Sequence, residues 1–169
     1  MSLNKIVYAC AAILIALAVT PAQAAEYPDK PITIVVPFPA GSTSDMIPRL
    51  VGPLLAKSLG VPVVIENRPG ANGSIGAMRV ATSAPDGYTI LMATTGVLAI
   101  NQWIYEKPQY SPEKDFTPIV NAASTPNMIV VNPSVKANTL TELVALAKSE
   151  PGKLSFASAG NGSTSHICG

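Results

Sequence analysis

Two segments rich in glycine, serine and threonine contain the residues most able to bind a small molecule. They are the first loop, 38–45 (FPAGSTSD), and the second loop, 158–166 (SAGNGSTSH). Each follows an apolar run and precedes a predicted helix. Free backbone N–H groups at a helix N-terminus, together with side-chain hydroxyls, can hold an anion. The pair of loops therefore predicts two binding segments for one small, negatively charged molecule.

Neither loop contains lysine or arginine. An anion held there would be neutralised by backbone amides, hydroxyls and helix dipoles, which suits a carboxylate better than a polyphosphate. Neither loop has the Gly-Lys-Ser/Thr ending of a phosphate-binding loop or the three spaced glycines of a dinucleotide fingerprint. The simplest alternative is that each loop is only a tight connection between a strand and a helix.

Individual side chains leave further alternatives open. Asp45 could cap the first helix or contact a donor group of the ligand, and the cap is favoured. His166, the only histidine, could be imagined in a hydrolase triad, but the chain has no Gly-x-Ser-x-Gly segment. A helix cap or a hydrogen bond to ligand suits His166 better, so no catalytic residue is assigned. With so few candidate ligands, neither a metal site nor a cofactor is expected.

The elements that must position these loops alternate between strand and helix. Strands are predicted at 32–36, 61–66 and 88–93, and helices at 45–58, 74–83 and 97–105. This order implies a parallel sheet with right-handed crossovers. Because Pro48 fits only the first turn of a helix, the cap of the first helix is predicted at Ser44 or Asp45 rather than at Ser42.

A second set of elements follows the polar stretch 107–116. Further strands are predicted at 116–122, 128–131 and 154–157. The capping box Thr139-Leu140-Thr141-Glu142 predicts a helix that runs to about Ser149. The chain thus divides into a first lobe, 25–106, and part of a second lobe, 107–169.

Residues 1–24 have the features of a signal peptide. Lys5 precedes an apolar run that is too short for a comfortable membrane span, and Ala22-Gln23-Ala24 is a small-x-small cleavage pattern. We therefore predict cleavage after Ala24 and export to the periplasm. Without Lys5, the ten remaining basic side chains balance the ten acidic ones, and no basic surface for nucleic acid is expected.

Six short motifs follow one another along the chain in a fixed order. They are YPDKPI (27–32), VPFPAG (36–41), ENRPGA (66–71), PDGYT (85–89), DFTPI (115–119) and SAGNGS (158–163). Together they resemble the Bug receptors, the periplasmic substrate-binding proteins of tripartite tricarboxylate transporters. The resemblance implies a two-lobed, Venus-flytrap α/β fold of the periplasmic-binding-protein type, without enzymatic activity. It also implies that a small carboxylate is captured and delivered to membrane permease subunits by a receptor that is monomeric when full length.

In that family the ligand carboxylate lies between the loop after the first strand and the Gly-Asn-Gly loop. The resemblance therefore assigns substrate-binding residues to the first loop, to the segment after the third strand and to the second loop. They are Phe38, Ala40, Gly41, Ser42, Thr43 and Asp45; Thr94 and Thr95; and Ser158, Asn161, Ser163, Thr164 and His166. Ser42 stands where the family usually has a second glycine, so its side chain could restrict the approach of ligand to the backbone.

Members of the family continue well past the second loop. The sequence is therefore expected to be a truncated form, incomplete in its second lobe, with a natural minimal half-receptor as the alternative. An incomplete sheet would expose strand edges and apolar surface, so the isolated chain is expected to be unstable or to aggregate. The sequence does not separate transport from a second possibility, an exported sensor that presents bound solute to a membrane signalling kinase.

Overall fold

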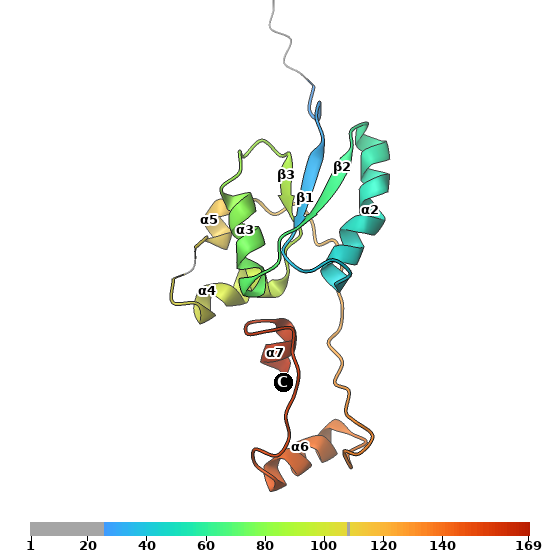
Figure 1. The fold of residues 1–169 in the computed structure, drawn as a ribbon, viewed down its shortest axis with the longest axis vertical. Coiled ribbons are helices and arrows are strands. Elements are labelled where there is room, and N and C mark those ends of the chain that lie inside the picture. Colours follow the sequence, from blue (N-terminus) through green and yellow to red (C-terminus); the bar gives the residue numbers. More distant parts are fainter. Residues whose placement is uncertain (1–25, 108) are drawn as a thin grey trace, which may run out of the picture.

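A computed structural model describes residues 26–107 and 109–169. The predicted signal peptide and its cleavage site lie outside the described residues. The described chain has two parts of different character: a sheet with its helices, up to about residue 116, and a long extended stretch that carries two more helices (Figure 1). Over these ranges, no helix is both long enough and apolar enough to cross a membrane.

A three-stranded parallel sheet lies at the centre of the first part. Its order is β2–β1–β3, with β1 (Ile32–Val36) between β2 (Val63–Asn67) and β3 (Thr89–Leu91). The central place of β1 agrees with its composition, because a strand with neighbours on both sides and helices on its faces is apolar along its whole length. Four of its five residues are buried. The predicted parallel sheet is confirmed.

Two of the strand boundaries differ from the prediction. β2 begins at Val63 rather than Val61, because Gly60 ends the preceding helix in a left-handed conformation and Pro62 has no N–H to donate to a ladder. The carbonyl of Pro62 still accepts a bond from Ile32 N, at 2.9 Å. β3 covers only Thr89–Leu91, since it pairs with β1 alone.

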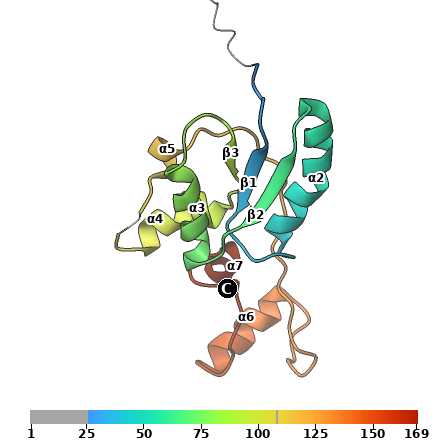
Figure 2. The same ribbon diagram turned by 45° about the horizontal axis from the view of Figure 1, so that its top comes forward.

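Helices cover the sheet as the alternating pattern predicts. α2 (Thr43–Leu59) packs beside β2, and α3 (Ser74–Ala81) packs on β1 and β3 (Figures 1 and 2). A short 3₁₀ turn, η1 (Ala71–Gly73), precedes α3. A π-helical turn, η2 (Gly96–Ile100), continues into α4 (Asn101–Ile104), which confirms the helix predicted at 97–105.

The start of α2 differs from the prediction. The N-cap is Ser42, and the helix runs on through both Pro48 and Pro53, so a cap at Ser44 or Asp45 is wrong. An interior proline costs a backbone hydrogen bond and normally bends or ends a helix. Here Pro48 and Gly52 are buried, and a Cβ at Gly52 would lie 3.6 Å from a methyl of Val63. Packing of α2 against β2 therefore outweighs the tendency of the two prolines to end the helix.

The apolar core of the first part includes residues from beyond the sheet. Ala77, Val97 and Tyr110 are its buried centre, with Phe38 and Phe116 among the side chains packed against it. The hydroxyl of Tyr110 donates to the carbonyl oxygen of Val97 at 2.6 Å. The short helix α5 (Pro112–Asp115) follows. Through Tyr110 and Phe116, the chain therefore packs on the core of the first part before it continues into the second part.

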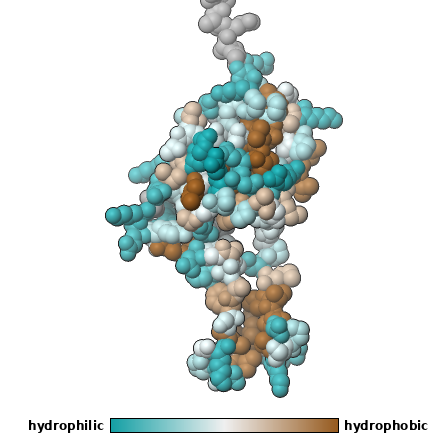
Figure 3. Space-filling model, viewed as in Figure 1, coloured by the Kyte–Doolittle hydropathy of each residue, from teal (hydrophilic) through white to brown (hydrophobic). Residues whose placement is uncertain are grey.

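The second part contains helices but no strand among its described residues, 117–169. The strands predicted at 116–122, 128–131 and 154–157 are wrong: these segments are irregular and extended. A strand needs a hydrogen-bonded neighbour, and no ladder joins these runs to another segment described here. Their large apolar side chains stay exposed, and hydrophobic surface gathers at this end of the molecule (Figure 3).

The two helices of the second part begin as the sequence predicts. In α6 (Leu140–Ser149), Thr139 Oγ1 accepts from Glu142 N at 3.2 Å, and Glu142 Oε2 accepts from Asn138 N at 2.7 Å. The cap predicted at Thr139 is therefore confirmed, whereas the Glu142 side chain bonds one residue before the cap and not to the Thr139 N–H of a complete capping box. The second loop opens a short helix, α7 (Thr164–Cys168), whose N-cap is Ser163.

Candidate functional site

The first loop and the segment after β3 lie at the same edge of the sheet. β1 and β3 are parallel neighbours, so the residues that follow their carboxyl ends emerge side by side. The first loop leaves β1 at Val36, and Thr94 and Thr95 come shortly after Leu91. This edge is also the side on which α7 lies (Figures 1 and 2). The topology thus gathers the three predicted binding segments at one end of the sheet.

Asp45 holds the first loop in place through hydrogen bonds to its carboxylate. Its carboxylate is 1% exposed. Gly41 N and Arg49 Nε each donate to Oδ2 at 2.8 Å, and Asn67 Nδ2 donates to Oδ1 at 2.8 Å. The guanidinium of Arg49, followed by these amide donors, holds the pKa of Asp45 well below its usual range. Asp45 is therefore a permanent anion whose oxygens are occupied by groups of the protein.

This network ties the first loop to the neighbouring strand. Asn67, the last residue of β2, donates to the carbonyl oxygen of Phe38 at 3.1 Å as well as to Asp45, and accepts from Arg49 at 2.9 Å. Asp45 is also the third residue of α2, where a negative charge is favourable next to the helix N-terminus. The loop is thus held in one shape before any ligand arrives.

Unused donors remain at the start of α2. The first amides of a helix have no acceptor within it, and no hydrogen bond found among the described residues uses those of Thr43 or Ser44. Ser42 Oγ is buried and has no hydrogen-bond partner among the described residues. A buried hydroxyl without a partner is costly unless something else satisfies it. The N-terminus of α2 therefore presents one hydroxyl and free amides to an acceptor.

Internal hydrogen bonds shape the second loop. Ser163 Oγ accepts a hydrogen bond from His166 N at 3.1 Å, and Gly162 N donates to His166 Nδ1 at 3.4 Å. Ser158 Oγ accepts from Gly160 N at 3.3 Å. The imidazole of His166 lies stacked against Phe156, with ring centroids 6.3 Å apart. These side chains hold the turn, while Asn161 is exposed and Thr164 begins the helix.

The two loops approach each other through intermediate residues. The first loop meets the start of α3, since a Cβ at Gly73 would lie 3.2 Å from Pro37 Cβ and 3.5 Å from the Phe38 ring. The second loop meets the segment after β3, since Gly96 lies against the carbonyl oxygen of Gly162. Gly96 directly follows Thr94 and Thr95 and so brings their segment to the second loop. The 3₁₀ turn η1 lies between the two contacts.

Four polar residues that organise these loops were not singled out from the sequence. Two of them had a readable signal: Arg49 follows Asp45 by four positions, the spacing of a helical ion pair, and Asn67 ends a strand next to the first loop. Asn72 and Asn101 had weaker signals. Asn72 stands between alanine and glycine, in a left-handed conformation with φ of 48°, and Asn101 is an amide within an apolar helix.

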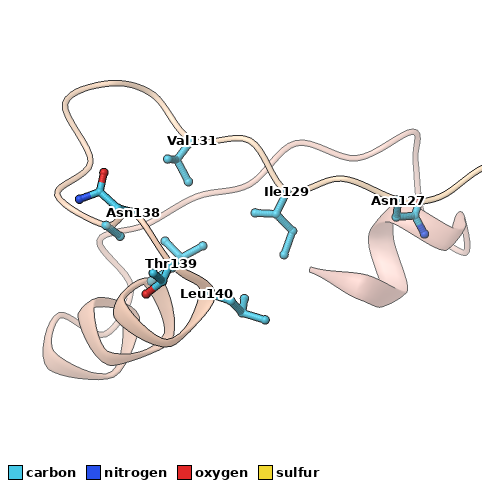
Figure 4. A pocket seen from close by; sticks show the side chains of 8 residues that line it. Asn127, Ile129, Val131, Asn138, Thr139 and Leu140 are labelled. Carbon is cyan, nitrogen blue, oxygen red and sulfur yellow. The ribbon is translucent and has the colours of Figure 1, made fainter.

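A separate cavity lies in the second part. Its volume is about 350 Å³, and it opens between the extended run 127–131 and the start of α6. Figure 4 shows Ile129, Val131 and Leu140 around this space. None of the predicted binding residues lines it. It is a groove in the exposed apolar surface of the second part, distinct from the loop region.

Comparison with known proteins places this arrangement in a family. The family model described as "Tripartite tricarboxylate transporter family receptor" matches residues 47–169. The UPF0065 protein in the tcbD-tcbE intergenic region of Pseudomonas sp. strain P51 is 42% identical over 141 residues, covering 83% of this chain and 42% of that protein. Protein BugT of Bordetella pertussis is 38% identical over 148 residues, covering 87% and 45%. The chain spans about half the length of the curated relatives that it matches.

Solved structures agree with the fold. R. palustris Rpa4515 with adipate is 37% identical with a TM-score of 0.78, covering 84% of this chain and 48% of that one. The periplasmic binding protein BugD is 35% identical with a TM-score of 0.68, covering 84% and 47%. MatC from Rhodopseudomonas palustris with bound malate is 42% identical with a TM-score of 0.53, covering 54% and 31%. The predicted α/β fold of the periplasmic-binding-protein type is thereby confirmed for the part that this chain spans.

Proposed function

Because this chain belongs to the tripartite tricarboxylate transporter receptor family, we propose that it captures a small carboxylate in the periplasm and delivers it to membrane permease subunits. In this proposal the first lobe extends to about residue 116, beyond the boundary predicted at 106, because Tyr110 and Phe116 pack in its core. The described residues after 116 belong to the second lobe. The lobes close on the ligand, and each contributes donors from the start of a helix. The protein carries out no chemical step on the bound solute.

The observation that carries this proposal is the unsatisfied N-terminus of α2. Ser42 Oγ is buried without a partner, and the amides of Thr43 and Ser44 are free among the described residues. A carboxylate accepts hydrogen bonds from hydroxyls and from backbone amides, and it gains from the helix dipole. Because Arg49 compensates the charge of Asp45, the nearby carboxylate repels an incoming anion less than a free one would.

The chemistry of the loops limits the ligand class. With no lysine or arginine in either loop, the site suits the moderate charge of a carboxylate. Two of the similar structures are described with adipate and with malate, and both are small dicarboxylates. Such ligands are the first candidates for this chain.

The predicted binding residues enter the proposal in two roles. Asp45 holds the first loop in shape. The other residues are proposed to line the ligand space: Phe38, Ala40, Gly41, Ser42 and Thr43; Thr94 and Thr95; and Ser158, Asn161, Ser163, Thr164 and His166.

Titration calorimetry tests the proposal. We expect heat on adding malate, adipate or a related small carboxylate to the folded receptor, and none with neutral amides of the same acids. Ser42→Ala should weaken binding by about tenfold, the value of one hydrogen bond to a charged group. The control is Ser58→Ala, an exposed serine near the other end of α2, which should bind as the parent does. A folded receptor that binds no carboxylate of the panel would refute the proposal.

A further inference from the structure

The second loop meets the first part of the molecule through a close contact between two glycines. A Cβ at Gly96 would lie 3.0 Å from the carbonyl oxygen of Gly162 and 3.1 Å from Asn72 Nδ2. A Cβ at Gly162 would lie 2.9 Å from Asn72 Nδ2 and 3.2 Å from Asn101 Oδ1. A Cβ at Gly162 therefore has no room, and a Cβ at Gly96 would fit only if its neighbours moved by a few tenths of an ångström.

Two asparagines that hydrogen-bond to each other form the surface against which Gly162 packs. Asn72 Nδ2 donates to Asn101 Oδ1 at 2.8 Å, and Asn101 Nδ2 donates to the carbonyl oxygen of Asn72 at 3.0 Å. Asn101 is 2% exposed and also donates to Ser74 Oγ at 3.1 Å. These bonds fix the carboxamide of Asn101 and tie Asn72 to it, although Asn72 Oδ1 is buried without a partner among the described residues.

This contact is the main point at which the end of the chain is buried. In residues 138–169, all of which the structure describes, Gly162 and Ser163 are the only buried positions. Ser163 is the N-cap of α7, and its hydroxyl bonds to His166 N. The position of Gly162 therefore determines where the start of α7 and the second loop lie relative to the sheet edge.

We propose that Gly96, Asn72 and Asn101 form a seat for Gly162, and that this seat sets the separation between the two ligand-holding loops. The inference rests on the proposed function, because it assigns the seat a role in capturing the same ligand. Hydrogen bonds weaken steeply outside about 2.7–3.2 Å, so an anion gripped from two sides needs both sets of donors at fixed separation. The seat fixes that separation in the closed arrangement of the lobes, and a fixed arrangement of donors raises affinity. Gly96 and Asn72 are thus positioning residues, not ligand contacts.

Two substitutions test the seat in different ways. Gly96→Ala places a methyl against the Gly162 carbonyl and should push the second loop away. Asn72→Gly removes the carboxamide but keeps a residue suited to the left-handed backbone, so it alters the seat with little strain. The matched control is Gly52→Ala, because a Cβ at Gly52 meets its neighbours only at 3.6 Å and 3.7 Å, which is ordinary contact.

Two measurements are made on each variant of the whole receptor. The first is the distance distribution between spin labels on cysteines at Arg79 in α3 and Lys148 in α6, both exposed, with Cys168 changed to serine. The second is carboxylate affinity by calorimetry. We expect Gly96→Ala to broaden or shift the distance distribution and to weaken binding by at least about tenfold, Asn72→Gly to do the same to a smaller degree, and Gly52→Ala to change neither.

The outcomes separate the seat from the proposed function. If Gly96→Ala and Asn72→Gly both fold, with the parent's distances and with affinities within about twofold of it, the seat is refuted. If the parent binds no carboxylate, the proposed function fails, and the distances alone decide whether the seat exists. Changed distances with unchanged affinity would refute the link between the seat and ligand capture.

Discussion

Segments of similar composition adopt opposite structures in the two parts of this molecule. Residues 32–36 (ITIVV) form the central strand of a sheet, whereas residues 128–131 (MIVV) are extended without a ladder. Ile34 is 8% exposed and Val130 is 82% exposed. Both runs have the β-branched residues that favour strands. The difference is the presence of neighbours that satisfy the backbone and of helices that cover the side chains.

The two loops show the same contrast on a smaller scale. The first loop is tied to the sheet by Asp45, Arg49 and Asn67, whose side chains bridge α2 and β2. The second loop is held mainly by its own serines and by His166. Within residues 158–166, burial against the rest of the molecule is confined to Gly162 and Ser163. A loop that is hydrogen-bonded to neighbouring elements is preorganised. A loop held only by its own hydrogen bonds needs a contact with another part of the molecule to fix its position.

The largest expected effect comes from truncating matched valines in the two parts. Val35→Ala in β1, where the side chain is fully buried, should lower the free energy of unfolding by about 2 kcal/mol through lost burial and a new cavity. Val130→Ala should change it by less than about 0.5 kcal/mol, because the side chain is already in water. Urea unfolding followed by circular dichroism measures both. Equal losses would mean that the second part has a core of its own.

A smaller effect is expected where the first loop meets α3. A Cβ at Gly76 would lie 2.7 Å from Pro37 Cβ and 3.0 Å from the carbonyl oxygen of Arg68. Gly76→Ala should therefore cost about 1–2 kcal/mol by forcing the first loop and α3 apart, even though alanine favours a helix. Thermal unfolding measures the loss, with Gly52→Ala in α2 as the tolerated control. A gain in stability would show that this approach is not tight.

Removal of the α6 cap should have a still smaller effect. Thr139→Ala deletes the acceptor for Glu142 N and should cost the helix about 1 kcal/mol. Because α6 makes little contact with the sheet, the loss should appear as faster amide hydrogen exchange in 140–149 and not in β1. Thr141→Ala, within the helix and exposed, serves as the control. Faster exchange in both regions would mean that the two parts unfold together.

The contribution of Asp45 to stability depends on pH only in acid. Asp45 has an ordinary pKa of 3.8, which its partners lower in the folded state. Its contribution to stability is therefore complete above that value and is lost as the pH falls through the lower folded value. Asp45→Asn should be less stable at pH 7 and should lose less stability on acidification than the parent. Glu113→Gln, at an exposed site, should follow the parent; a parallel acid profile for Asp45→Asn would contradict the role of the network.

Much of the geometry around the candidate site could be predicted because loop chemistry and strand order are local signals. The glycine and hydroxyl residues of both loops stand where the structure has turns that open helices, and parallel strands bring the first loop and Thr94 to one edge. The cap of α2 could not be predicted from local rules, since burial of Pro48 and Gly52 against β2 decides it. The strands predicted in the second part are wrong for the converse reason. The local preference for a strand was present, but no pairing partner lies among the residues that the structure describes.

The sequence by itself determined the order of elements in the first part, the buried strand 32–36 and the positions of both loops, together with the Thr139 cap of α6. Each of these depends on residues within one short segment, where backbone preference, apolar pattern and capping act directly. Only the tertiary structure decided that Asp45 is sequestered by Arg49 and Asn67, that Asn72 and Asn101 receive Gly162, and that 128–131 is left unpaired. These outcomes join residues far apart in the chain, and such contacts depend on how whole elements pack.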